Sequence, residues 1–364
     1  MARVSDQLLF RHSLLNAYHP SLVCCDDQEW IVTHDLGTST ESLDYRTVAR
    51  RSRDAGETWE DLGPLLNPRA HPETTHTIRV SRLRDGRLVG FGKLEDRSHH
   101  RAARCNRETL GQVPMRLFWI ESSDIGTTWS PPKFIDPPLE GPTWELCHHL
   151  IELPEGSWGA PVATWRDWHG ALPNGYQTGI LISHDKGATW TEFRRTFDGR
   201  ATGFIHWEQS VTTFARSQLL ATAWAFDPLT KKTLPSVFTT SSDGGRTFHP
   251  PLENGIFAQT CKVLALSEGC VAAAYRRHDE SGLWMDIVKV GSESWQRLDR
   301  FPLWLGVHPS GSQGINPAEQ LRALSLGYPS MQKLGDGRIL LVFWCEEAGR
   351  TNLRILTIDR DQPE

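Results

Sequence analysis

Long hydrophobic runs are missing from this 364-residue sequence, and no apolar stretch approaches the roughly twenty residues of a membrane-spanning helix. Basic tracts are missing too. The 39 Lys and Arg stand against 44 Asp and Glu, for a net charge of −5, so nucleic acid is not an expected partner. The segment from Met1 to Phe10 has one Arg and no apolar core, unlike a secretory signal. We therefore expect a cytoplasmic protein without membrane insertion.

Paired cysteine motifs are missing as well, so the cysteine spacing is not that of a metal or disulfide framework. The seven cysteines include no C-x-x-C pair, so we expect reduced thiols and no zinc–cysteine site. The sequence also lacks a glycine-rich phosphate loop and EF-hand spacing, so no cofactor is expected. No low-complexity linker divides the chain, which predicts that residues 1–364 form one domain.

An internal repeat is present instead. Four segments read S-x-D-x-G-x-T-[WF]: residues 52–59, 122–129, 183–190 and 241–248. At average residue frequencies, one chance copy has a probability on the order of one in a thousand. Asp can accept hydrogen bonds from its own turn, Gly can adopt a positive φ, and the aromatic residue can cover the turn. Each of these Asp boxes is therefore predicted to be a structural hairpin turn rather than a catalytic motif.

A second repeat places a tight turn between apolar runs, most clearly at residues 83–89 and 334–340, where Asp-Gly predicts a hairpin. Equivalent positions recur six times at intervals of 52 to 70 residues: Ser21, Arg79, His149, Ser210, Lys262 and Ser330. This spacing predicts an all-β fold, a six-bladed β-propeller of four-stranded antiparallel blades. A strand near residues 7–12 is expected to complete the last blade, so that the two ends of the chain close the ring.

Polar residues gather at one end of the predicted inner and second strands, on the face opposite the Asp-box turns. They are predicted to converge on a ligand site at one rim of the central channel, although some could simply cap strands. The candidates for substrate binding are Tyr18, His19, His34, Asp35, Arg97, His149, Arg166, Asp167, His206, Gln209, Asp227, Arg276, Arg277 and Trp344. Adjacent His148 and His149 are expected to point to opposite faces of a strand, so that only one of them lines the site.

Taken together, the boxes and the blade count resemble the sialidase (neuraminidase) superfamily of Asp-box, or BNR-repeat, propellers. That family has an Asp acid/base in the pattern D-[IL]-x-x-V-x-R-R-S, and residues 44–52 read DYRTVARRS, so the resemblance implies that role for Asp44. It also implies a Tyr nucleophile at the start of the last blade, where Gly327-Tyr328-Pro329-Ser330 is similar, with Glu208 as its base. The implied activity is that of an exo-acting glycoside hydrolase.

The sequence departs from this family where three arginines bind the substrate carboxylate. The first-strand Arg-Ile-Pro of the family is replaced by Tyr18-His19-Pro20, and blade 4 has Asp227 where an Arg would follow strand B. Arg276 and Arg277 remain in blade 5. The expected substrate is therefore a terminal acidic sugar, with sialic acid itself disfavoured by the incomplete clamp.

Two other functions also fit the sequence. A polysaccharide lyase would use His or Tyr to remove the proton α to a uronate carboxylate, and a non-catalytic propeller would only bind carbohydrate. Rim histidines such as His34, His76 and His206 could instead ligate a metal. Residues 97–113, with four arginines and one acidic residue, are expected to form a basic lid or a mobile surface loop. Residues 302–327 are expected to form a second long connection.

Overall fold

The computed structural model describes residues 2–140, 143–146, 148–277, 279–306 and 324–360. Most of the long connection expected at 302–327 lies outside these residues, as do Cys147 and His278. The described chain is almost entirely β-structure, with one short 3-10 turn, η1 (Pro68–Ala70). In these segments no helix is long and apolar enough to cross a membrane.

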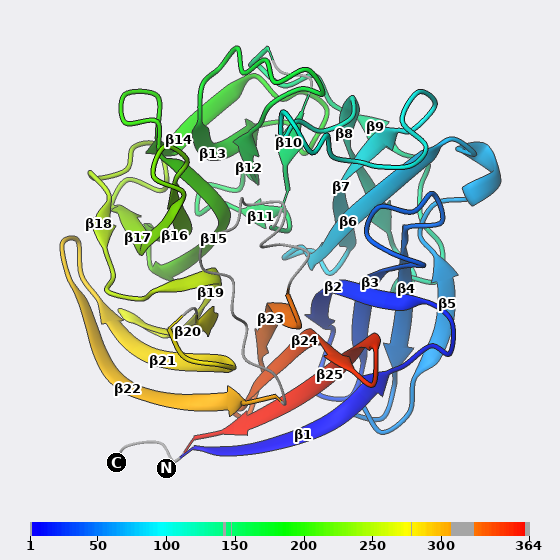
Figure 1. Ribbon diagram of the computed structural model, residues 1–364. Coiled ribbons are helices and arrows are strands. Elements are labelled where there is room, and N and C mark those ends of the chain that lie inside the picture. Colours follow the sequence, from blue (N-terminus) through cyan, green and yellow to red (C-terminus); the bar gives the residue numbers. More distant parts are fainter. Residues whose placement is uncertain (1, 141–142, 147, 278, 307–323, 361–364) are drawn as a thin grey trace. The chain divides into compact units, whose positions relative to one another are not determined.

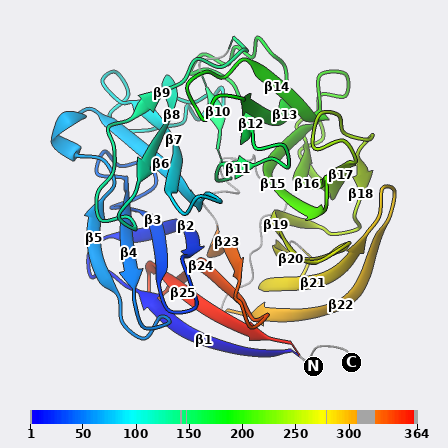
Figure 2. The same cartoon turned by 180° about the vertical axis from the view of Figure 1, so that it is seen from behind.

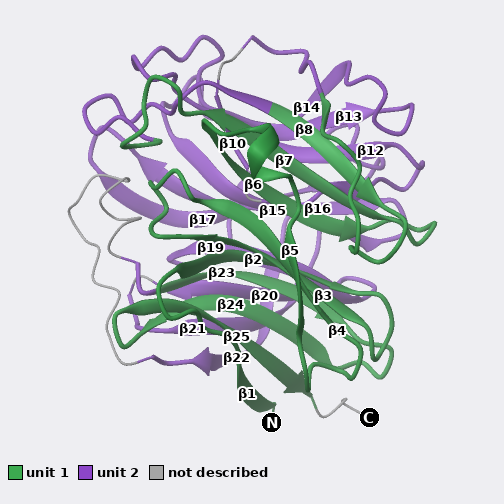
Figure 3. Cartoon of the chain, turned by 90° about the vertical axis from the view of Figure 1, so that its right-hand side faces the viewer, with its two compact units in different colours: residues 1–104, 117–134, 326–364 green, residues 105–116, 135–325 purple. Residues whose placement is uncertain are grey.

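The chain divides into two compact units (Figure 3). Unit 1 comprises Met1–Arg104, Leu117–Phe134 and Leu326–Glu364, and unit 2 comprises Cys105–Arg116 and Ile135–Ser325. Each unit is built on three antiparallel sheets. The expectation of a single domain over residues 1–364 stays a prediction.

Unit 1 contains three four-stranded sheets (Figures 1 and 2). The first runs β2 (Asn16–Cys24), β3 (Trp30–Gly37), β4 (Arg46–Ser52) and β5 (Glu60–Pro64). The second runs β6 (Thr74–Arg82), β7 (Leu88–Asp96), β8 (Met115–Ser122) and β9 (Lys133–Phe134). The third runs β23 (Leu326–Lys333), β24 (Ile339–Glu347), β25 (Arg350–Asp359) and β1 (Arg3–Phe10). The N-terminal strand thus pairs antiparallel with the C-terminal strand.

Unit 2 contains the other three sheets, each of them antiparallel. The first runs β10 (Trp144–Glu145), β12 (Trp158–Thr164), β13 (Gln177–Ser183) and β14 (Glu192–Asp198), with β11 (Ile151–Glu152) also paired to β12. The second runs β15 (Ile205–Ala215), β16 (Gln218–Asp227), β17 (Lys232–Ser241) and β18 (Leu252–Glu253). The third runs β19 (Ala258–Ser267), β20 (Cys270–Arg277), β21 (Leu283–Val290) and β22 (Trp295–Trp304).

Six such sheets in the described chain confirm the predicted all-β fold class, the six-bladed β-propeller. One local prediction is wrong. His148 and His149 fall between β10 and β11, outside either strand, and their rings lie 4.2 Å apart at an angle of 33°. Because the inner strand is broken at this point, the alternation of side chains along a strand does not apply to the two histidines.

The core lies between neighbouring sheets of each unit, because their middle strands are buried on both faces. Strand β16 reads QLLATAWAFD, β20 reads CVAAAYRR and β24 reads ILLVFWCEE, and nearly every apolar side chain in them is inaccessible to solvent. Continuous apolar runs of this length, bounded by turns, are typical of fully buried strands. In unit 1, Ile78 and Val80 of β6 pack against Val23 and Ile31 of the neighbouring sheet.

The four Asp boxes join the third and fourth strands of their sheets, as predicted. In each box the Asp accepts the backbone N–H of the Thr that follows it by four residues, at 2.8 to 3.0 Å. The box Gly has a φ between 76° and 90°, and its N–H donates to the box Ser. The boxes are therefore hydrogen-bonded turns, which confirms their structural role.

Candidate functional site

Four inner strands carry a β-bulge close to their first residues. The register shifts within Tyr18–Ser21 of β2, Gly327–Ser330 of β23, Trp207–Ser210 of β15 and Gln259–Lys262 of β19. One non-glycine residue in each bulge has a positive φ: 46° at His19, 51° at Tyr328, 53° at Glu208 and 56° at Thr260. Such a backbone costs about 1–3 kcal/mol per residue and is concentrated at functional sites, where a bulge re-aims a side chain. The strained residues are therefore candidate functional positions in both units. A regular strand pattern would not identify them.

In unit 1 two of these bulges bring His19 and Tyr328 together. Strands β2 and β23 lie side by side in both views (Figures 1 and 2), and the N–H of Leu22 donates to the Ser330 hydroxyl at 2.9 Å. The imidazole of His19 stands edge-on to the ring of Tyr328, with the centroids 5.5 Å apart. The predicted nucleophile therefore lies beside His19, the residue at whose position the resemblance implies an arginine.

A buried arginine lies next to the Tyr328 phenol. Arg79 of β6 donates from Nε to the Tyr328 hydroxyl at 3.1 Å, and its guanidinium carbon lies 4.9 Å from the centre of the Tyr328 ring. Its Nη2 is 3.2 Å from Oδ2 of Asp35, with both side chains buried. Burial by itself would lower the pKa of Arg79, but Asp35 and then Tyr328 raise it above the ordinary value. Arg79 is thus a permanent cation beside the phenol.

Asp35 of β3 holds this group together. Its carboxylate accepts hydrogen bonds from the hydroxyls of Tyr45 at 3.0 Å and Thr47 at 2.6 Å, in addition to its pair with Arg79. Burial would raise the pKa of Asp35, but the charge of Arg79 and the hydrogen bond with His19 bring it well below the usual range. Asp35 is therefore anionic and fully enclosed. It positions its neighbours, and its contact with substrate stays a prediction.

His19 is the accessible member of the cluster. Its Nδ1 lies 2.8 Å from the Tyr45 hydroxyl and 3.4 Å from Asp35, while 31% of its side chain stays exposed. Burial lowers the pKa of His19, and the hydrogen bond with Asp35 acts in the opposite direction, so the imidazole is neutral near pH 7. The rings of Tyr18 and Trp344, both predicted site residues, lie 6.0 and 6.5 Å from it.

Asp44 lies in the loop between β3 and β4. Its carboxylate accepts the N–H and the hydroxyl of Thr38 at 3.0 and 2.7 Å, and the hydroxyl of Ser42. Burial would raise the pKa of Asp44, but these hydrogen bonds lower it. In this structure the carboxylate closes its own turn, and its role as acid/base stays a prediction.

The arginine-rich insertion is anchored at its beginning. The guanidinium of Arg97 is fully buried and donates to the carbonyl oxygens of Glu41 and Arg101 at 2.7 and 3.0 Å. Arg104 pairs with buried Glu95 at 2.6 Å and lies 5.0 Å from the ring centre of Tyr45. Burial would raise the pKa of Glu95, but Arg104 and then Lys93 lower it to about 2. These contacts tie the insertion to the sheets of unit 1.

Unit 2 carries its own group of predicted residues. The carboxylate of Glu208 accepts a hydrogen bond from the Thr260 hydroxyl, so that the two bulge residues of β15 and β19 contact each other. Gln209 is buried and donates to the carbonyl oxygens of Val162 and Gly179 at 3.0 and 2.6 Å. Arg276, also buried, donates to Gln259. Burial lowers the pKa of Arg276 to about 10, although Glu208 acts in the opposite direction.

The remaining predicted residues have contacts typical of turns and packed strands. Asp167 and Asp227 accept backbone N–H groups of their own loops, and Arg277 pairs with Asp279 at 2.8 Å. Arg166 donates to the hydroxyl of Tyr176 at 3.0 Å. Three of the predicted site histidines are mostly enclosed, and burial lowers their pKa values to about 4. They are His34, His149 and His206. Neither ring nitrogen of His34 has a hydrogen-bond partner among the described residues. The roles of these residues in binding stay predictions.

Sequence reasoning missed the residues that organise unit 1. The repeat pattern identifies Arg79 only as an equivalent position of the blades, and Tyr45 and Arg104 are not among the predicted site residues. A signal was present for Arg79, because a charged residue between Ile78 and Val80 interrupts an inner strand whose neighbours are apolar. In the described residues no group of three or more His, Cys, Asp or Glu is placed to hold a metal ion.

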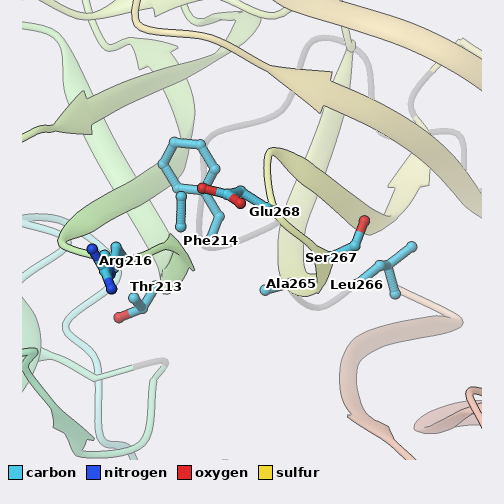
Figure 4. A pocket seen from close by; sticks show the side chains of 8 residues that line it. Thr213, Phe214, Arg216, Ala265, Leu266, Ser267 and Glu268 are labelled. Carbon is cyan, nitrogen blue, oxygen red and sulfur yellow. The ribbon is translucent and has the colours of Figure 1, made fainter.

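A separate hollow opens in unit 2 (Figure 4). Thr213, Phe214 and Arg216 line it from the β15–β16 hairpin, and Ala265, Ser267 and Glu268 line it from the β19–β20 hairpin. These residues lie at the opposite strand ends from Glu208 and Thr260. The hollow is therefore separate from the bulge residues of these strands.

Comparison with known proteins agrees with the fold. The model of the family described as BNR repeat-like domain matches residues 103–341. A crystal structure of a protein of unknown function from Dyadobacter fermentans is 18% identical, covers 99% of each chain and has a TM-score of 0.75. A Hadza microbial sialidase is 16% identical over 94% of this chain and 65% of its own, with a TM-score of 0.68.

A Trypanosoma rangeli sialidase in complex with the inhibitor DANA is likewise 16% identical, over 97% of this chain and 59% of its own, with a TM-score of 0.66. At these identities the likenesses show the fold alone, which is the sialidase-like propeller. No curated protein matches the sequence significantly.

Proposed function

The chain belongs to the family of BNR repeat-like domain proteins, and from this premise we propose that it is an exo-acting glycoside hydrolase that cleaves a terminal acidic sugar from a glycan or glycoside. One observation carries the proposal: the hydroxyl of Tyr328 lies 3.1 Å from the guanidinium of buried Arg79. A phenol becomes a useful nucleophile when its oxygen can carry negative charge, and a fixed cation at hydrogen-bond distance stabilises that charge.

In the proposed reaction, the oxygen of Tyr328 attacks the anomeric carbon and the glycosidic bond breaks. The leaving oxygen takes a proton, and water then releases the sugar from Tyr328. A tyrosine nucleophile is the known exception to the use of two carboxylates. Asp44 is the proposed proton donor by resemblance, and it would have to leave its hydrogen bonds with Thr38 and Ser42 to act. Glu208 of unit 2 keeps its proposed role as base.

The acidic sugar is proposed to differ from sialic acid. His19, a neutral group, occupies the position at which the resemblance expects the first arginine of the clamp. The aromatic rings of Tyr18 and Trp344 beside it, with centroids 5.5 Å apart, offer a surface against which a sugar ring can pack. A Trypanosoma rangeli sialidase of similar fold has been solved with sialic acid, which supports a carbohydrate as the class of partner.

The proposal is tested by Tyr328→Phe with a panel of chromogenic glycosides that includes sialosides and uronides. Wild-type protein should hydrolyse at least one uronide or other acidic glycoside, and the variant should lose roughly 10³-fold or more of kcat while binding the same sugar. Tyr275→Phe is a matched control, because it removes a buried phenol whose hydroxyl donates to Asp286 at 2.7 Å. Its turnover should stay near wild type.

Other outcomes discriminate between the alternatives. Turnover that survives Tyr328→Phe would exclude the tyrosine nucleophile. Binding of glycans without cleavage by the wild-type chain would identify a carbohydrate-binding propeller, and an unsaturated uronide among the products would identify a lyase. Glu208→Gln should also lower kcat if this carboxylate is the base, and an unchanged kcat would remove it from the mechanism.

A further inference from the structure

The bulges of β2 and β23 present His19 and Tyr328 by the same local device. Each residue has a positive φ and is followed by Pro and Ser, in His19-Pro20-Ser21 and Tyr328-Pro329-Ser330. A residue before proline normally adopts an extended backbone, so the left-handed conformation is costly at both positions. The fold maintains this strain twice in neighbouring strands, and the result is that two reactive side chains meet with their ring centroids 5.5 Å apart.

The contacts of His19 indicate which ring nitrogen carries the proton. Anionic Asp35, 3.0 Å from the Tyr45 hydroxyl, is the stronger acceptor for the hydroxyl hydrogen, so we assign the hydrogen of the 2.8 Å contact between Tyr45 and His19 to Nδ1. The other ring nitrogen, Nε2, therefore has a free lone pair in the neutral imidazole. No residue of the described chain hydrogen-bonds to Nε2.

Accessibility distinguishes His19 from its neighbours. The side chain of His19 is 31% exposed, whereas Tyr328 and Trp344 are each 5% exposed and Tyr45 is 1% exposed. The exposed part of His19 therefore lies beside the Tyr328 ring, with the two ring centroids 5.5 Å apart. Behind the imidazole, anionic Asp35 is placed to stabilise an imidazolium, as the carboxylate of a catalytic Asp–His pair does.

Asp44, the other candidate for proton transfer in unit 1, is arranged differently. Its carboxylate already accepts hydrogen bonds from Thr38 and Ser42, and these favour its charged form. A carboxyl group that donates protons near neutral pH has the opposite requirement, an environment that favours the protonated form. For the attack of water a base must start unprotonated, and burial keeps the imidazole of His19 in that neutral form near pH 7.

We propose that His19 is a catalytic residue of this site, which acts through Nε2 as the base for the water that releases the sugar from Tyr328; this inference rests on the hydrolase function proposed above. The oxygen of water forms the new bond to the anomeric carbon as the bond between that carbon and the Tyr328 oxygen breaks. The electron pair of the broken bond returns to the Tyr328 oxygen beside Arg79, and the water proton passes to Nε2.

His19→Asn tests the proposal with little disturbance of the fold. Asn tolerates a positive φ, and its side chain can keep the contact made by Nδ1 while Nε2 is lost. With the chromogenic glycoside that the wild-type chain hydrolyses fastest, kcat should fall roughly 10²–10⁴-fold. Because the first step survives, one equivalent of chromophore should appear in a rapid burst and KM should fall. His184→Asn, in the third Asp box, is the control and should behave as wild type.

Azide provides the second measurement. As an anionic nucleophile it has no proton to lose, so it should restore turnover of His19→Asn and yield a glycosyl azide, without accelerating the control. A wild-type rate in His19→Asn, or a loss of kcat without burst and without azide rescue, would overturn the role of His19 while leaving the hydrolase function intact. No turnover by the wild-type chain would overturn both.

Discussion

The inner strands of the two units share a backbone feature but surround it with different chemistry. His19 and Tyr328 in unit 1, and Glu208 and Thr260 in unit 2, all have a φ between 46° and 56° within a bulge. In unit 1 both residues precede a proline, and in unit 2 they precede Gln209 and Cys261. The comparison teaches that the bulge determines where a side chain is aimed, while the buried residues beneath it determine its chemistry.

The largest difference lies in the buried arginine of each unit. Arg79 is paired with Asp35 at 3.2 Å, and this pairing raises its pKa in spite of burial. Arg276 donates to the amide of Gln259, and burial lowers its pKa to about 10. The ion pair with Asp35 thus favours the charged form of Arg79, whereas burial disfavours the charged form of Arg276.

Replacement of each arginine by methionine should give the largest difference between the two units, measured as the loss in the free energy of unfolding. Arg79→Met leaves the Asp35 charge buried without its cation, which is expected to cost about 3–5 kcal/mol in the free energy of unfolding. Arg276→Met takes one donor from the neutral amide of Gln259 and a favourable charge from Glu208, and it should cost less, about 1–3 kcal/mol. Urea denaturation of both variants measures the difference. Equal losses would show that the Asp35 pair does not set unit 1 apart.

The sequence predicted the turns and the sheets because their signals are local. An Asp box contains all the atoms of its own hydrogen-bond pattern, so the residues of 122–129 suffice to predict the turn. Six repeated strand patterns likewise predicted six sheets. The pairing of Arg79 with Tyr328 depends on residues 249 positions apart, and no local pattern encodes that distance.

The bulges could not be predicted from the sequence, for a related reason. A shift of register is a property of two paired strands, and the sequence around Tyr18 and Ser21 reads as an ordinary strand with one proline. The match of Asp44 to a family pattern identifies it as a candidate, but it could not show that Thr38 and Ser42 bind its carboxylate. Local sequence predicted where candidates lie, and the tertiary contacts decide their state.

A second, smaller effect should appear in acid. Glu95 is buried with Arg104 and Lys93, which bring its pKa to about 2 against about 4.3 in an unfolded chain. A carboxylate whose pKa is depressed by folding stabilises the protein above its unfolded pKa, and this contribution is lost as the pH falls towards the folded pKa. Glu95 should therefore contribute up to about 3 kcal/mol near neutral pH, lost between about pH 4.5 and 2.

Glu95→Gln measures this contribution. The variant should be less stable than wild type at pH 7, and the gap should narrow as the pH approaches 2, when urea unfolding is followed across that range. Glu73→Gln is a matched control, because Glu73 pairs with Arg101 at the surface of the same insertion and both side chains are more than half exposed. A gap between Glu95→Gln and wild type that is constant with pH would contradict the assignment of the buried charge to Glu95.

The smallest effect is expected where the two units are alike. Asp124 in unit 1 and Asp243 in unit 2 each accept the N–H and the hydroxyl of a Thr, with the hydroxyl at 2.6 Å in both boxes. Both turns are at the surface, so Asp124→Ala and Asp243→Ala should each cost only about 1 kcal/mol. If residues 1–364 unfold as one domain, both substitutions shift the same single transition by the same amount. Two transitions, each sensitive to only one of the substitutions, would instead show that the units unfold separately, and the contrast between Arg79 and Arg276 would then have to be measured on each transition by itself.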